Sequence, residues 1–208
     1  MNFDLGKVGI EENLQYECIF TTKSKDGIKN AAPFGFTYLG DDKVQCHLFE
    51  GSKTLENILY AKEYACNITQ DPLVFTYSML NCLGEEYYCD DTEIPTIKNT
   101  PAYIIVDVCD VDIKTPENFP IKGDSSIYFI TGKIRDFVIN DESARAFNRG
   151  LGGLIESLTN FSRYKIVDED KRKDYLERLY ENQRVINKVS DEKTKKVMEK
   201  LKEEYEKN

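Results

Sequence analysis

The sequence predicts a mainly β fold of the α+β class, in which a β-barrel over residues 1–140 is followed by a helical hairpin over residues 141–208. Short apolar runs separated by turn residues fill the first part, a pattern typical of β domains. Two longer runs, 102–113 and 127–139, alternate apolar and polar residues as half-buried strands do. After Asn140 the apolar residues recur at helical spacing instead.

The remaining strands of the expected barrel are bounded by recognisable turns. Asp26-Gly27 is a hairpin dipeptide, and a second turn follows at residues 40–42. We therefore expect the other strands at 14–22, 28–39, 44–49 and 64–69.

Two short helices and one long loop are expected within the barrel domain. Ser52 is a natural N-cap for a helix over about 54–61, and Asp71-Pro72 opens another, since proline suits the first helical position. Residues 83–101 are acidic and aperiodic, which predicts a long loop that serves as a lid or an interface element. The apolar residues that we expect to fold back over the barrel are Tyr87, Tyr88 and Ile94.

The sequence of the C-terminal part predicts two helices. The first spans 143–164 despite three glycines that weaken it, and the second spans 168 to about 201. A break near Ser190-Asp191 would cap a last helical stretch. Because residues 192–208 are charged on nearly every face, we expect this tail to fray.

Composition excludes several function classes. A formal net charge of −9 and a pI of about 4.8 argue against nucleic acid and anionic membrane surfaces as partners. No apolar run approaches the length of roughly 20 residues that a membrane span needs. Residues 1–10 lack a signal-peptide core, so the expected location is the cytoplasm.

Cysteine and histidine usage predicts no metal site. None of the six cysteines forms a C-x-x-C motif, and His47 is the only histidine. Four cysteines lie in strand-like apolar runs, where we expect buried, reduced thiols: Cys18, Cys46, Cys66 and Cys109.

One candidate binding motif opens the first helix. Gly51-Ser52-Lys53-Thr54 offers unpaired backbone N–H groups, hydroxyl donors and a cation at a helix N-terminus, a combination that suits a phosphate. Asn57 follows one turn later, so its side chain and that of Thr54 can face the same ligand. The motif is not a P-loop, and a simple serine N-cap beside a solvated lysine remains the alternative.

A second candidate motif lies inside the second expected strand. The run Asn30-Ala31-Ala32-Pro33-Phe34-Gly35 combines small residues, a proline and a glycine, as an edge strand with a bulge would. The same residues suit a backbone against which a flat ligand can lie. The two motifs together favour a phosphorylated, ring-bearing cofactor, for which FMN is the first candidate.

The order of these motifs resembles the archaeal flavoproteins of the DUF447 family, within the FMN-binding split-barrel superfamily. The similarity covers most of residues 10–165 and rests on Glu17, Asp26-Gly27, 30–35, 49–54, Asn57, Asn67-Ile68, Asp71-Pro72 and Phe75. It continues in the C-terminal part through Asn148-Arg149, Glu156 and Ser162-Arg163.

This resemblance implies a split barrel with specific cofactor contacts. The FMN phosphate would lie on Ser52, Lys53 and Thr54, with Asn57 nearby, and backbone groups of residues 30–33 would bond the isoalloxazine edge. Asn67 and Asp71 would line the ribityl chain or the ring, although a strand-end residue and an N-cap are equal alternatives. Small split barrels bind FMN at a two-fold interface, which implies a homodimer.

The expected function is that of an FMN-binding flavoprotein, reductase-like in its oxidoreductase chemistry, with NAD(P)H binding transiently because no G-x-G-x-x-G motif occurs. No residue stands out as a dedicated proton donor. One alternative keeps the barrel and binds the deazaflavin F420, although few basic residues surround the motif. The other is a non-catalytic, dimeric flavin-binding module for interaction or sensing.

Overall fold

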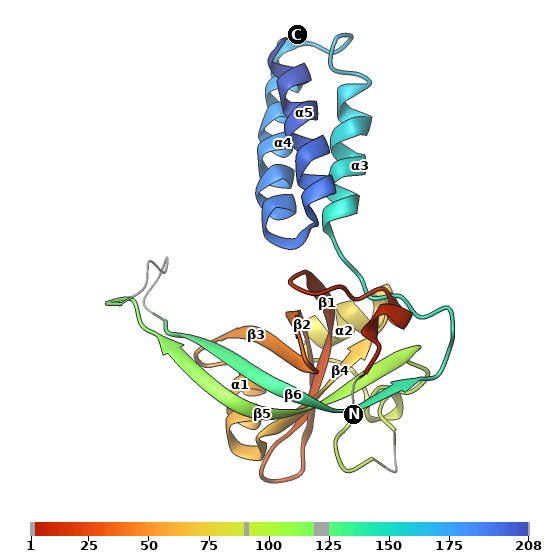
Figure 1. The fold of residues 1–208 in the computed structure, drawn as a ribbon, viewed down its shortest axis with the longest axis vertical. Coiled ribbons are helices and arrows are strands. Elements are labelled where there is room, and N and C mark those ends of the chain that lie inside the picture. Colours follow the sequence, from red (N-terminus) through yellow and green to blue (C-terminus); the bar gives the residue numbers. More distant parts are fainter. Residues whose placement is uncertain (1–2, 90–91, 119–124, 208) are drawn as a thin grey trace. The chain divides into compact units, whose positions relative to one another are not determined.

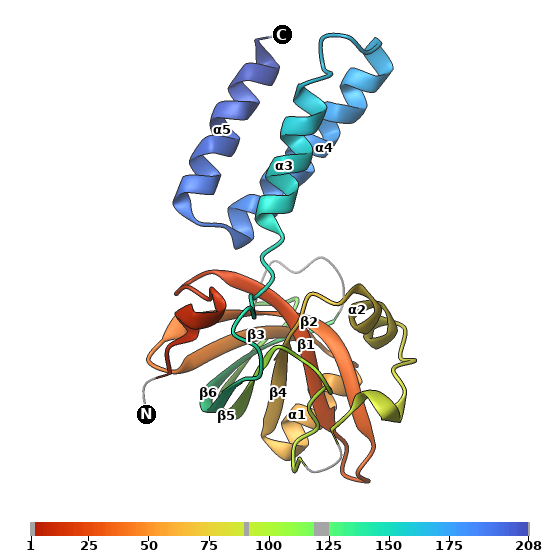
Figure 2. The same cartoon turned by 90° about the vertical axis from the view of Figure 1, so that its right-hand side faces the viewer.

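The computed structural model describes residues 3–89, 92–118 and 125–207. The chain divides into two compact units, Met1–Phe147 and Asn148–Asn208. The first unit is a closed antiparallel barrel with the strand order β1-β2-β3-β6-β5-β4 (Figure 1, Figure 2). Its strands are β1 (Gln15–Lys23), β2 (Lys29–Gly40), β3 (Lys43–Phe49), β4 (Glu63–Ile68), β5 (Ala102–Lys114) and β6 (Ile127–Ile139).

Inward-facing side chains form the core of the barrel, and they alternate clearly along β3. Along β3, Val44, Cys46 and Leu48 are buried, while the residues between them lie at or near the surface. Every strand contributes inward-facing apolar side chains to one cluster, so the barrel encloses a single core. The mainly β barrel with C-terminal helices is confirmed.

Strand β2 separates from β3 over residues 29–35, more than half of its own length. Their pairing runs only from Phe36–Cys46 to Gly40–Lys43, whereas β1 pairs with β2 along the whole range Lys29–Thr37. Beyond Cys46, β3 continues beside β6 alone. In the described chain, residues 29–35 of β2 therefore have a neighbouring strand on one edge only.

Helices follow β3 and β4. Helix α1 (Lys53–Ala61) begins after Ser52, whose Oγ accepts a hydrogen bond from the Leu55 N–H at 3.2 Å. Helix α2 (Pro72–Met79) begins after Asp71, whose carboxylate accepts from the Leu73 N–H at 2.8 Å. Two short 3-10 helices, η1 (Leu5–Val8) and η2 (Glu85–Tyr87), complete this unit.

The segment that was expected to be a long loop is anchored to the barrel. Asn67 is fully buried, and its Nδ2 donates to the Ile19 carbonyl at 3.0 Å and to Thr21 Oγ1 at 2.9 Å. Its Oδ1 accepts from the Ile97 N–H at 2.8 Å, which fixes the returning half of the segment. Tyr88 and Ile94 are buried, as predicted, and Tyr87 is partly buried.

The second unit is a bundle of three helices rather than a hairpin: α3 (Gly150–Phe161), α4 (Glu169–Val189) and α5 (Glu192–Glu206). The expected start of the first helix at 143 was wrong. The preceding residues pair with the barrel instead, since Ala146 N–H donates to the Val8 carbonyl at 2.8 Å and Phe147 accepts from the Glu17 N–H at 2.8 Å.

The expectation that the tail frays was also wrong. Three residues on one side of α5 are buried, namely Met198, Leu201 and Tyr205, and Tyr205 Oη donates to the Ser157 carbonyl at 2.9 Å. A sparse apolar stripe in a charged helix is therefore enough to pack it into the bundle.

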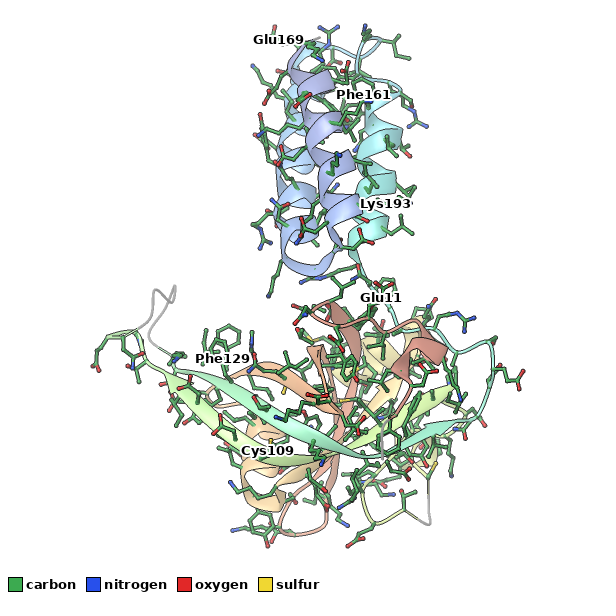
Figure 3. All side chains as sticks on the ribbon, viewed as in Figure 1. Glu11, Cys109, Phe129, Phe161, Glu169 and Lys193 are labelled. Atoms are coloured by element: carbon green, nitrogen blue, oxygen red, sulfur yellow. The ribbon has the colours of Figure 1, made fainter. Side chains whose placement is uncertain are left out.

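The cysteines follow the prediction at three of four positions. Cys18, Cys46 and Cys66 are buried in the barrel, whereas Cys109 is exposed (labelled in Figure 3). The register between β5 and β6 shifts at Val108–Asp110, and such a bulge re-aims side chains, which accounts for the exposed thiol.

We predict that Asn67→Ala destabilises the barrel. Three buried groups each lose one hydrogen bond, so the free energy of unfolding should fall by about 2 to 3 kcal/mol. Urea unfolding measures this change, and amide exchange at Ile97 should accelerate. The matched control is Asn118→Ala, which removes one exposed bond to the Thr115 N–H and should cost far less. Equal losses in both variants would contradict the anchoring role.

A second prediction concerns the turn before α1. Gly51 has φ +84°, and a Cβ there would meet no atom within 4 Å, so a substitution causes backbone strain without a steric clash. Gly51→Ala should lower the free energy of unfolding by about 1 to 2 kcal/mol, and Gly51→Asn by less, because asparagine tolerates this conformation better. Chemical denaturation of both variants tests this order. A larger loss for asparagine than for alanine would refute it.

Candidate functional site

The N-terminus of α1 presents unused hydrogen-bond donors. The first intrahelical hydrogen bond runs from the Glu56 N–H to the Ser52 carbonyl at 3.1 Å. Ser52 Oγ accepts a hydrogen bond from the Leu55 N–H. The N–H groups of Lys53 and Thr54 precede these bonds, so the helix itself leaves them available. Together with the Lys53 ammonium group and the helix dipole they favour an anion.

Behind these donors lies a polar network that joins the helix to the barrel. Asn30 Nδ2 on β2 donates to Thr54 Oγ1 on α1 at 2.9 Å. Asn57 Nδ2 donates to Thr22 Oγ1 on β1 at 3.0 Å, and Asn30 Nδ2 lies 3.5 Å from the same oxygen. Thr22, Thr54 and Asn57 are buried, so these bonds are largely shielded from water.

The free edge of β2 begins at this network. Ser24 N–H donates to the Ile28 carbonyl at 2.9 Å, and Asn13 N–H donates to the Tyr38 carbonyl at 2.7 Å. In an antiparallel ladder, bonded and non-bonded pairs alternate, so the even-numbered residues of β2 direct their backbone groups toward β1. The N–H of Ala31 and the carbonyls of Ala31 and Pro33 therefore point to the edge that β3 leaves uncovered.

The remaining residues of this strand motif suit that edge. Pro33 has no N–H, and its place at a strand edge avoids the loss of a ladder bond. The side chain of Ala31 is buried under α2, whereas Ala32, Phe34 and Gly35 are partly exposed. The structure thus brings both sequence motifs together. The helix motif (Gly51, Ser52, Lys53 and Thr54) lies at the Asn30 end of the β2 edge that β3 leaves unpaired.

Two further predicted contact residues, Asn67 and Asp71, make bonds within the barrel unit. The amide of Asn67 makes three internal bonds and is fully buried, which matches the strand-end alternative. Asp71 caps α2 and lies on the wall of a cavity of about 510 Å³. That cavity is lined by residues 69–71, Val74, Glu86, Tyr87 and 97–101, and none of them belongs to α1 or β2.

Sequence reasoning missed Thr22 as part of the site. The Asp26-Gly27 turn pairs the strands so that Thr22 stands opposite Asn30. Counting residues outward from the turn on both strands gives this pairing from the sequence alone. That Thr22 lies opposite a residue of the strand motif was the signal that could have identified it. The sequence did not settle the direction of His47, and the structure places it outward against Phe129, with ring centroids 4.1 Å apart.

Thiol chemistry inside the barrel is suppressed. Burial raises the pKa of the Cys46 thiol to about 12, although a hydrogen bond to Tyr64 opposes the shift. Burial also raises the pKa values of Cys66 and Tyr64. These groups stay protonated at neutral pH, and the reactive thiolate form is absent there.

Two further features bear on the class of site. Across residues 3–89, 92–118 and 125–207, no group of three or more histidine, cysteine or acidic side chains is arranged to hold a metal ion. Nor does any helix among those residues combine the length and apolar character that crossing a bilayer requires.

Comparison with known proteins assigns the family. A model described as the N-terminal domain of DUF447, a protein family of unknown function, matches residues 16–141, and a second DUF447 model matches residues 148–203. An uncharacterized protein of the archaeon Methanocaldococcus jannaschii is 26% identical over 187 residues, which cover 88% of this chain and 94% of that protein.

Solved structures show the same fold. An FMN-bound DUF447 protein of Methanosarcina mazei is 25% identical with a TM-score of 0.52, covering 96% of this chain and 99% of that one. Component B of the nitrilotriacetate monooxygenase of Bacillus cereus is 14% identical with a TM-score of 0.50, covering 71% and 81%, a likeness of fold alone. The predicted split-barrel class is confirmed, and the chain belongs to the DUF447 family.

Proposed function

We propose that this protein is a flavoprotein that binds FMN at the junction of α1 and β2. The single observation that carries the proposal is the 2.9 Å hydrogen bond from Asn30 to Thr54. It joins the anion-binding end of α1 to the start of the uncovered strand edge. One ligand with a phosphate at one end and a hydrogen-bonding ring at the other would occupy both features.

The donor set of the site fits this cofactor. The phosphate would be held by the N–H groups of Lys53 and Thr54, the Thr54 hydroxyl and the Lys53 ammonium group. Ala31 and Pro33 offer a backbone donor and acceptors to the pyrimidine edge of the ring, which carries both kinds of group. The FMN-bound relative from Methanosarcina mazei, aligned over nearly its whole length, supports this assignment.

Bound FMN supplies the capacity to accept and pass on electrons, and the chain supplies position and electrostatics. The proposed activity is therefore reductase-like, with NAD(P)H as a transient electron donor. Neither Cys46 nor Tyr64 serves as a proton donor at the flavin, because both side chains are sealed in the barrel core. The residues of the junction bind and orient the cofactor.

A second copy of the chain would complete the site in this proposal. Three large apolar side chains in or next to the two motif-bearing elements are mostly exposed: Ile28 before β2, Phe49 before the α1 turn, and Tyr60 on α1. Large apolar side chains exposed in one patch are typical of interfaces, and this proposal expects these three to share such a patch. A two-fold dimer would cover these side chains and exclude water from the ring.

We predict that the purified protein, incubated with FMN and desalted, retains a flavin absorbance spectrum. Ser52→Ala/Thr54→Ala should lose at least tenfold in FMN affinity, because the variant lacks the helix cap and one phosphate donor. Thr159→Ala/Ser162→Ala is the matched control, since it removes two exposed hydroxyl groups from the other unit.

The same preparation separates the proposed function from its alternatives. Oxidation of NADH or NADPH by the flavin-loaded protein supports the reductase, whereas tight FMN binding without turnover supports a binding or sensing module. A wild-type protein that retains no FMN but retains F420 would refute the cofactor assignment. Equal FMN loss in the control variant would refute the assigned phosphate position.

A further inference from the structure

We propose that Thr22 is a positioning residue that makes the site select phosphorylated over unphosphorylated flavin. This inference rests on the proposed function and deepens it. Thr22 belongs to neither sequence motif, lies on β1 and is buried. Its hydroxyl oxygen is nonetheless the point at which the amides of Asn30 and Asn57 meet, at 3.5 Å and 3.0 Å.

The direction of each hydrogen bond decides which proton of the network is left for a ligand. An amide nitrogen can only donate, so Thr22 Oγ1 acts as the acceptor for Asn57 and Asn30. Asn30 Nδ2 also donates to Thr54 Oγ1 at 2.9 Å. The oxygen of Thr54 is thereby used as an acceptor, and its own O–H proton must be directed to a different acceptor.

The position of Thr54 decides what that acceptor is. Thr54 is the second residue of α1, next to the N–H groups that precede the first helical bonds. In this proposal its hydroxyl proton adds to the set of donors at that helix end. A phosphate group, which offers only acceptors when ionised, matches this set better than a ribityl hydroxyl group does.

Thr22 fixes the positions of Asn30 and Asn57 on the barrel side of this network. Its bond to Asn57 pins α1 to β1, and its contact with Asn30 orients the amide that faces Thr54. A valine at this position has nearly the same shape but accepts no hydrogen bond, so Asn30 and Asn57 would be free to rotate. Thr54 could then turn its proton toward Asn30 instead of the ligand.

The test compares FMN with riboflavin, which lacks the phosphate. Fluorescence titration gives both dissociation constants for the wild type, Thr22→Val and Thr22→Ser. Thr22→Val should reduce the preference for FMN over riboflavin by about tenfold, as expected for roughly one well-placed hydrogen bond to a charged group. Thr22→Ser keeps the hydroxyl and should restore the preference.

A matched control separates positioning from packing. Thr96 is also a buried threonine, and its hydroxyl has no hydrogen-bond partner among the described residues, so Thr96→Val should leave the preference unchanged. If Thr22→Val fails to fold, Thr22→Ala provides the same comparison with a smaller side chain.

The outcomes distinguish this inference from the proposed function. Wild-type protein that binds FMN no better than riboflavin would refute the phosphate site itself. A wild-type preference that survives unchanged in Thr22→Val, or a variant that loses both ligands equally, would refute only the positioning role. A loss confined to FMN and restored by serine supports it.

Discussion

The parting of β2 from β3 is the constraint on which the rest of the site depends. A barrel strand normally has both edges paired, and a free edge is exposed to unwanted association. Here the pairing ends at Phe36–Cys46, and α1 fills the turn between β3 and β4. The opening leaves backbone groups of Ala31 and Pro33 for a ligand, and the Asn30–Thr54 bond places the helix end beside them.

Such an opening needs support from the surrounding structure. Strand β1 pairs with β2 along residues 29–37, and a buried apolar cluster packs Val74 of α2, Tyr88 and Ile97 against Ile19 and Ala31. Asn67 then joins Ile97 to β1, because its amide accepts one buried hydrogen bond from Ile97 and donates two to Ile19 and Thr21. Strand β2 is thus paired with β1 on one side and unpaired on the other, which suits a preformed binding site.

Local signals predicted most of this arrangement from the sequence. Alternation identified β5 and β6, the Asp26-Gly27 turn placed the first hairpin, and Ser52 located the start of α1. Non-local contacts explain the errors. The expected helix began at residue 143, but the backbone of Ala146 and Phe147 bonds Val8 and Glu17 instead. The apolar stripe of α5 is too sparse to be recognised without its bundle partners. Thr22 was missed because its place opposite Asn30 depends on strand register, which the motifs alone do not contain.

The central claim is that one ligand spans the end of α1 and the open edge of β2. Amide chemical shifts measured by NMR during titration with FMN and with riboflavin test it most directly. The account predicts shifts at Ala31 with both ligands, and large shifts at residues 52–55 with FMN alone. Shifts confined to the cavity at residues 69–71 and 97–101, with none at residues 52–55, would contradict it.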